Sequence, residues 1–233
     1  MRIRLLFLCL ALSCTAAQAE DAAKSFLDPS QVDASRFLPP PPAADSAQAR
    51  AEIVELERIA KERTPETFAA AARDARDETG AVFADALGAG FDLARLPATA
   101  RMLGDVHATE EAVSKPAKEY FHRERPWVLD PALVTCTEHK PGSSPTSYPS
   151  GHATIAYAMG VILAALVPGK AQAILARSAQ FSENRLVCGV HYRSDIAAGE
   201  AFGTIIAIDL MQNAGFRAEY DAAAAELSAA HLR

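Results

Sequence analysis

The sequence predicts an all-α fold, a single compact helical bundle. In several segments the apolar residues recur every three or four positions, which is the period of an amphipathic helix. The apolar–polar alternation that marks a half-buried strand is almost absent. The chain is rich in alanine, leucine, glutamate and arginine, and its 233 residues suffice for one domain with a substantial core.

The first half of the chain is expected to be an extended lead-in followed by helices. Four consecutive prolines, from Pro39 to Pro42, favour a polyproline conformation over a helix. The apolar residues then adopt helical spacing over residues 46–61, 65–76 and 81–87.

Three further helices are expected in the second half. Lys118 and Arg125 lie seven residues apart, almost two helical turns, so both side chains are expected on one face of a helix that ends before the next proline. The other two are expected from Gly151 or His152 to Leu166, where Pro168-Gly169 stops the helix, and over about 196–213.

The N-terminal residues have the features of a cleaved signal peptide. Two early arginines precede an apolar run over 5–12, which is too short for a permanent bilayer span. Ala17-Gln18-Ala19 fits a signal-peptidase site, so we expect cleavage before Glu20 and a periplasmic protein. Cys14 raises the rival idea of a lipoprotein, but the residues before it make a poor lipidation site. The expected division is a signal peptide over 1–19, a proline-rich lead-in over 20–44 and a helical domain over 45–233.

The overall charge limits the partners of the chain. A formal net charge of −6 argues against nucleic acid or an anionic membrane surface as the main partner. The two most apolar helices of the second half are too short or too charged to predict a membrane span. An anion must therefore be captured by a local cluster of cations. The sequence leaves open whether the chain forms a homo-oligomer.

Two cysteines lie outside the expected signal peptide. In an oxidising compartment Cys136 and Cys188 can form a disulfide, which would stabilise the fold by about 4 kcal/mol through loop closure. The alternative is a pair of buried free thiols.

Two clusters offer groups that suit a tetrahedral oxyanion. Lys118 and Arg125 supply an ammonium and a guanidinium, although such a pair is more often a solvated basic face. The turn Pro149–His152 opens an apolar helix, and free backbone N–H groups at a helix start attract anions. Ser150 is either a simple N-cap or both cap and ligand. His152, in the first helical turn, can serve as a general acid, although a lone histidine there is usually structural.

A third cluster supplies a nucleophile. Arg185 is followed by His191 and Asp195, and a neutral imidazole attacks well when a carboxylate holds its other nitrogen. Asp195 has an equal claim to be the N-cap of the helix beginning near Ile196, unless Ser194 caps that helix and leaves the carboxylate free.

The order and spacing of these clusters resemble a known signature. Lys-x6-Arg-Pro, Pro-Ser-Gly-His and Arg-x5-His-x3-Asp, in this order over 118–195, are similar to the motifs of the type 2 phosphatidic acid phosphatase superfamily. The strings FLPPPPAADS and CGVHYRSD resemble its bacterial class A non-specific acid phosphatases, and the likeness extends from about Phe37 to near the C-terminus. Asn184 is a departure, because that family usually has serine directly before the third-cluster arginine, and it bears on the placement of Arg185.

The resemblance implies a role for each matching residue. His191 would attack phosphorus to give a phosphohistidine, Asp195 would polarise it, and His152 would protonate the leaving alcohol. The phosphoryl oxygens would be bound by Lys118, Arg125, Ser150, Gly151 and Arg185.

The expected function is therefore an exported acid phosphatase of broad specificity for small phosphate monoesters. No cluster has the composition of a metal site, so we expect the enzyme to need no metal and no cofactor. His152 must start protonated and His191 neutral, which predicts a pH optimum of about 5 to 6.5. Two alternatives are a vanadium-dependent haloperoxidase, since the same groups would hold vanadate, and a non-catalytic phosphate-binding protein.

Overall fold

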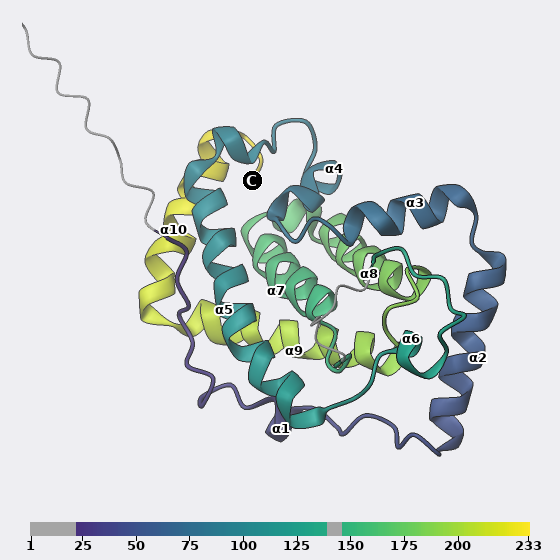
Figure 1. Ribbon diagram of the computed structural model, residues 1–233. Coiled ribbons are helices and arrows are strands. Elements are labelled where there is room, and N and C mark those ends of the chain that lie inside the picture. The colour runs from purple at the N-terminus through teal and green to yellow at the C-terminus, as the bar shows by residue number, and fades with distance from the viewer. Residues whose placement is uncertain (1–21, 139–145) are drawn as a thin grey trace, which may run out of the picture.

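The computed structural model describes residues 22–138 and 146–233, and in these ranges it consists of helices and their connections (Figure 1). The prediction of an all-α fold is confirmed, since the described residues contain no strand, only an isolated bridge between Glu124 and Thr146. The expected signal peptide and its cleavage site lie outside the described residues. The α-helices are α1 (Ala34–Phe37), α2 (Ala47–Glu62), α3 (Pro65–Asp74), α4 (Ala84–Leu87), α5 (Pro97–Phe121), α6 (Pro126–Leu129), α7 (Gly151–Leu166), α8 (Ala171–Val187), α9 (Arg193–Gln212) and α10 (Ala214–Ala229).

Helix α7 is the centre of the bundle. Its residues are apolar on every side, and Ile162, Leu163 and Leu166 are fully buried. A helix without a polar face must be surrounded by other elements. Helices α5, α8 and α9 pack around α7, and α10 covers α5 and α9 (Figure 1). The predicted bounds of α7 are confirmed at both ends.

Two glycines let α9 lie unusually close to α7. A Cβ atom at Gly199 would lie 2.6 Å from the backbone oxygen of Ser150, and one at Gly203 would overlap the backbone oxygen of Thr154. Helix backbone cannot move aside as a flexible side chain can. The close approach brings the N-terminus of α7 to the first turn of α9, where the Ser150 N–H donates to the backbone oxygen of Asp195 at 3.0 Å.

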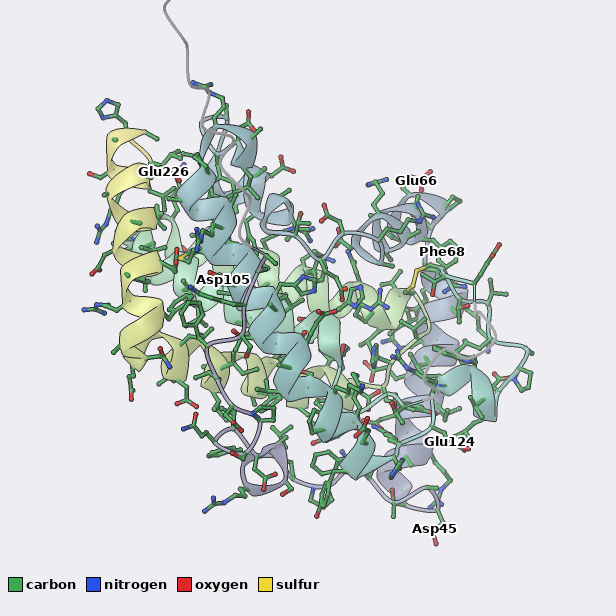
Figure 2. The ribbon with its side chains drawn as sticks, turned by 60° about the vertical axis from the view of Figure 1, so that its left-hand side comes forward. Asp45, Glu66, Phe68, Asp105, Glu124 and Glu226 are labelled. Atoms are coloured by element: carbon green, nitrogen blue, oxygen red, sulfur yellow. A yellow bond between two sulfur atoms is a disulfide. The ribbon has the colours of Figure 1, made fainter. Side chains whose placement is uncertain are left out.

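The lead-in before α2 is part of the packed structure. Leu27, Val32 and Leu38 belong to the main core, and the proline run that follows forms no helix, as predicted. The Lys24 N–H donates to Asp105 of α5 at 2.9 Å, so the lead-in lies along α5 (Figure 2).

The predicted helices of the first half are confirmed in α2 and shortened elsewhere. The segment 65–76 ends as a helix at Asp74, and 81–87 is split into the 3-10 turn Gly80–Phe83 followed by α4. Further 3-10 turns cover Leu93–Arg95 and Pro168–Lys170.

Cys136 and Cys188 form a disulfide, with 4.8 Å between their Cα atoms (Figure 2). Of the two alternatives for this pair, the disulfide is therefore correct. The Cys136 N–H also donates to the Cys188 backbone oxygen at 3.1 Å. The bond ties the connection between α6 and α7 to the end of α8, directly before His191.

The close contact between α7 and α9 predicts the effect of one added methyl group. Gly203→Ala should destabilise the fold by about 2 kcal/mol or more, because overpacking against backbone exceeds the gain in helix propensity. Thermal unfolding should show a melting temperature at least about 4 °C lower. Gly169→Ala is the matched control, because a Cβ there has no neighbour within 4 Å. Equal melting temperatures for the two variants would contradict this packing argument.

Candidate active site

The predicted site residues meet at one end of the bundle, around a cavity of about 870 Å³. The end of α5, the start of α7, the end of α8 and the start of α9 converge there. Five of the eight predicted residues line the cavity: Lys118, Arg125, Gly151, His152 and His191. The other three, Ser150, Arg185 and Asp195, are buried beside or behind these residues.

Lys118 and Arg125 meet in the cavity, but they do not share a helix face as predicted. Helix α5 ends at Phe121, and His122 takes a left-handed conformation with φ of 49°. Arg125 is extended, as a residue before proline prefers, and it is the N-cap of α6. The helix therefore ends at this turn, and His122 is exposed. The Lys118 ammonium donates to the backbone oxygen of Pro149 at 2.5 Å.

His191 is held in one tautomer by contacts to both ring nitrogens. Its Nδ1 lies 3.2 Å from Asp195 Oδ2, and its Nε2 lies 2.7 Å from an NH1 nitrogen of Arg125. A carboxylate only accepts and a guanidinium only donates, so Nδ1 carries the proton and Nε2 presents a lone pair. Burial, followed by the charge of Arg125, lowers the pKa of His191 well below its usual value, which favours the neutral ring.

Asp195 is neither the N-cap of α9 nor a surface residue. Helix α9 begins at Arg193, three residues before the predicted start, and Tyr192 is the N-cap. The Asp195 carboxylate reaches back to accept from the Tyr192 N–H at 2.9 Å. The Asp195 side chain thus accepts from the backbone at the start of α9 and also orients His191. The sequence offered these two roles as alternatives. Ser194, the other proposed cap, has its hydroxyl 2.7 Å from Arg123.

Arg185 is the clearest sign of an anion site. Arg185 is 5% exposed. Neither its Nε nor its NH1 nitrogen has a hydrogen-bond partner among the described residues. A buried guanidinium with free N–H groups is costly unless a ligand satisfies it. The neighbouring Asn184 donates to Asp74 of α3 at 2.7 Å, so the residue that departs from the family pattern anchors α8 to α3.

The start of α7 supplies the remaining oxyanion donors. Ser150 is the N-cap, and its hydroxyl oxygen accepts from the Ala153 N–H at 3.4 Å. The Gly151 position faces the cavity, where a Cβ would lie 3.8 Å from the Lys118 side chain. Glycine therefore leaves the helix N-terminus open to a ligand.

Glu78 is a site residue that the motifs do not reveal. Its Oε1 lies 2.7 Å from His152 Nδ1, while His152 Nε2 lies 3.3 Å from the backbone oxygen of Ala75. Although burial alone would raise the pKa of Glu78, the hydrogen bond and charge of His152 lower it to about 2. Glu78 is far from His152 in sequence, in a loop without a motif, so no local pattern marks it.

Two influences act on the charge of His152 in opposite directions. Burial and then the charge of Arg185 lower the pKa of His152, and the Glu78 carboxylate partly opposes them. Both ring nitrogens face acceptors, and only the imidazolium can donate to both, so this geometry favours the protonated ring. The protonated start of the reaction stays a prediction, which the pH dependence of activity tests.

Glu110 is a second missed residue of the cavity. It lies on α5, is 5% exposed and accepts from the Ser114 hydroxyl at 2.5 Å. Burial raises the pKa of Glu110 to about 7, against the opposing charge of Lys118. On the acid side this carboxyl is mostly protonated and adds little negative charge beside the cations.

Arg123 and Glu52 are two further missed residues, and they form an ion pair. An NH1 nitrogen of Arg123 donates to Asp195 Oδ1 at 2.7 Å, and its NH2 nitrogen donates to Glu52 of α2 at 2.6 Å. Glu52 is buried, four residues before the buried Leu56. A charged residue on the apolar face of a predicted helix was the one signal in the sequence for this pair.

The charged forms of the three cations at the site are destabilised in the free protein. Burial and then the charge of Arg125 lower the pKa of Lys118 to about 8 and that of Arg185 to about 9. Burial lowers the pKa of Arg125 to about 10. All three stay charged below pH 8. An oxyanion with two negative charges would relieve the repulsion, so the electrostatics favour such a ligand.

Comparisons with known proteins show which family the chain is similar to. The pattern of the PAP2 superfamily matches residues 100–218. An acid phosphatase of Zymomonas mobilis is 32% identical over 198 residues, which cover 83% of this chain and 75% of the relative. Non-specific acid phosphatases of Salmonella typhi and Providencia stuartii are 30% and 28% identical, over 75% and 84% of this chain and 72% and 82% of theirs.

A solved structure shares the fold. It is a transmembrane PAP2-type phosphatidylglycerolphosphate phosphatase from Bacillus subtilis, with a TM-score of 0.54 and 15% identity, over 75% of this chain and 89% of that one. Among the described residues of the present chain, no helix has the length and apolar character to cross a membrane. The matched superfamily pattern covers half of the chain, and the acid phosphatases match most of it. The chain therefore belongs to the PAP2 superfamily and is a phosphatase.

Proposed function

We propose that the protein is an exported acid phosphatase that hydrolyses phosphate monoesters through a phosphohistidine at His191. The observation that carries the proposal is the orientation of His191, whose Nε2 lone pair is fixed by Asp195 and Arg125 on the wall of a cavity that Lys118 and Arg125 also line. Anion binding alone would not require a neutral imidazole held in this way. Export rests on the signal-peptide features of residues 1–19.

Binding comes first in the proposed reaction. The unpartnered N–H groups of Arg185, the ammonium of Lys118 and the N–H groups at the start of α7 would hold the phosphoryl oxygens. Arg125 would turn its NH1 donor from His191 Nε2 to a phosphoryl oxygen, which frees the Nε2 lone pair for attack. These donors stabilise the charge that spreads over the equatorial oxygens in the transition state.

Two half-reactions would follow. The Nε2 lone pair of His191 forms the N–P bond while the bond to the ester oxygen breaks, and His152 gives its proton to that oxygen. Asp195 stabilises the positive charge that develops on the imidazole through the Nδ1–H bond. Water then attacks phosphorus, His152 takes its proton, and the N–P bond breaks to release phosphate and regenerate His191.

Broad specificity and acid-side activity fit the distribution of charge. The groups that converge in the cavity suit a phosphoryl group, whereas the other lining residues include the dispersed polar side chains of Glu111, Lys115 and Glu119. A mostly protonated Glu110 on the acid side leaves the cationic charge available to the substrate. The relatives from Salmonella typhi and Providencia stuartii are non-specific acid phosphatases, which supports the same substrate class.

The first test is hydrolysis of p-nitrophenyl phosphate by the purified protein across pH 4 to 9, with EDTA present. We expect turnover on the acid side that survives the chelator. His191→Asn should lower kcat by about a thousandfold or more, since no nucleophile is left. His231→Asn, outside the cavity, is the matched control and should match the wild type. A folded wild-type protein without turnover would contradict the proposed function, and loss of turnover with EDTA would contradict its metal independence.

The pH profile tests the role of Glu78. His152 works protonated, so activity falls as pH rises through its pKa, and the Glu78 carboxylate holds that pKa up. Glu78→Gln should move the alkaline limb of kcat/KM down by about one pH unit, a tenfold loss above it.

The acid limb of the Glu78→Gln variant should not move. Glu57→Gln, on the exposed side of α2, is the control and should leave both limbs in place. An unchanged alkaline limb in Glu78→Gln would contradict the proposal that Glu78 holds up the pKa of His152.

A further inference from the structure

Asp195 lies at the end of a chain of buried charges that begins on α2. Glu52 Oε2 accepts from the NH2 group of Arg123 at 2.6 Å, and the NH1 group of Arg123 donates to Asp195 Oδ1 at 2.7 Å. The other carboxylate oxygen of Asp195 faces His191. The side chains of Arg123, Glu52 and Asp195 are 10%, 6% and 0% exposed, so the interactions are weakly screened by solvent.

Arg123 is itself fixed in several directions. Its guanidinium stacks 4.0 Å from the ring centre of Tyr192, and its NH1 group also donates to the Ser194 hydroxyl at 2.7 Å. Glu52 accepts from the Ser194 N–H at 2.7 Å with its second oxygen. The pair thus clamps the first turn of α9, from which Asp195 points toward His191.

The charge on Asp195 depends on its surroundings. Burial raises the pKa of Asp195, and Arg123 is the largest influence that opposes this rise. The groups that face or influence Asp195 from the surrounding elements are Lys118 of α5, Arg123, Arg125, Ser147, Tyr148, His191 and Tyr192, with Glu52 of α2 behind Arg123. Lys118 and Arg125 would be engaged by the phosphoryl group in the proposed reaction, whereas Arg123 lies on the other carboxylate oxygen.

We propose that Arg123 is a positioning residue that keeps Asp195 ionised and aligned, and so keeps His191 in the tautomer that can attack phosphorus. The inference rests on the proposed function for its catalytic meaning. Glu52 supports Arg123 but is not required for the charge on Asp195.

Loss of the Arg123 charge should change the tautomer of His191, which loss of a merely structural contact would not do. A protonated Asp195 would donate to Nδ1 of His191 and force the proton to Nε2, where the NH1 donor of Arg125 opposes it. The nucleophile would be lost below the pKa of Asp195. Without the charge of Arg123 that pKa rises, so the acid limb of activity should move to higher pH.

The chain offers a closely matched control. Arg193 also joins α9 to α2, through an ion pair with Glu55 at 2.7 Å, and it pairs with Glu183 of α8. Its contacts are with these carboxylates and not with His191 or Asp195. Arg193→Met therefore removes an ion pair between the same two helices without touching the charge on Asp195.

The experiment compares Arg123→Met, Arg123→Lys, Glu52→Gln and Arg193→Met by the pH dependence of kcat/KM. Arg123→Met should move the acid limb up by about one pH unit, so its loss of kcat/KM should be about ten times larger below the limb than above it. Arg123→Lys should restore most of the limb, and Glu52→Gln and Arg193→Met should leave it in place. A loss that is uniform over pH, or equal in Arg123→Met and Arg193→Met, would overturn the inference.

A second readout does not depend on turnover. Nitrogen-15 NMR of the histidine side chains reports which ring nitrogen of His191 carries the proton. The Nδ1–H form should disappear on acidification at a pH about one unit higher in Arg123→Met than in the wild type. Equal titrations would overturn the inference even if the wild type hydrolyses phosphate monoesters. If the wild type lacks turnover, the proposed function fails, while this titration still decides the role of Arg123. Should Arg123→Met not fold, Arg123→Gln, which also removes the charge, takes its place with the same expected shift and the same contradicting outcome.

Discussion

Three buried cations that converge on one site are the constraint on which that site depends. Lys118, Arg125 and Arg185 come from three parts of the chain, and burial lowers the pKa of each. Charged groups that repel one another in a weakly screened space are kept together only by a well-packed fold. The central helix α7 and the glycine contact with α9 provide that frame, and in the proposed function a phosphoryl group would supply the opposing charge.

Two carboxylate–histidine pairs give the two imidazoles different tasks. His191 is buried between a donor and an acceptor, which fixes a neutral ring whose Nε2 carries the lone pair and faces Arg125. His152 faces two acceptors, one of them Glu78, which favours the protonated ring on the acid side. The same residue type can therefore act as nucleophile and as general acid, because its neighbours differ.

The sequence predicted the helical fold and singled out eight residues that the structure brings to one end of the bundle, because the motifs lie at helix ends and the apolar pattern of α7 is unambiguous. It placed Lys118 and Arg125 on one helix, because nothing local foretold the left-handed turn at His122. It also missed Glu78, Arg123 and Glu52, whose partners lie far away in sequence. Such ion pairs are created by tertiary packing, and only the buried position of Glu52 left a trace in the helical pattern.

The central claim is that His191 becomes covalently phosphorylated during turnover. The most direct measurement is rapid quenching of the wild-type protein mixed with a radiolabelled phosphate monoester at acid pH, followed by peptide mapping of the label. We expect an acid-labile, alkali-stable phosphoramidate on the peptide that contains His191, formed and lost at rates that account for turnover. Turnover without any label on that peptide, under conditions that preserve phosphohistidine, would contradict the account and indicate direct attack by water.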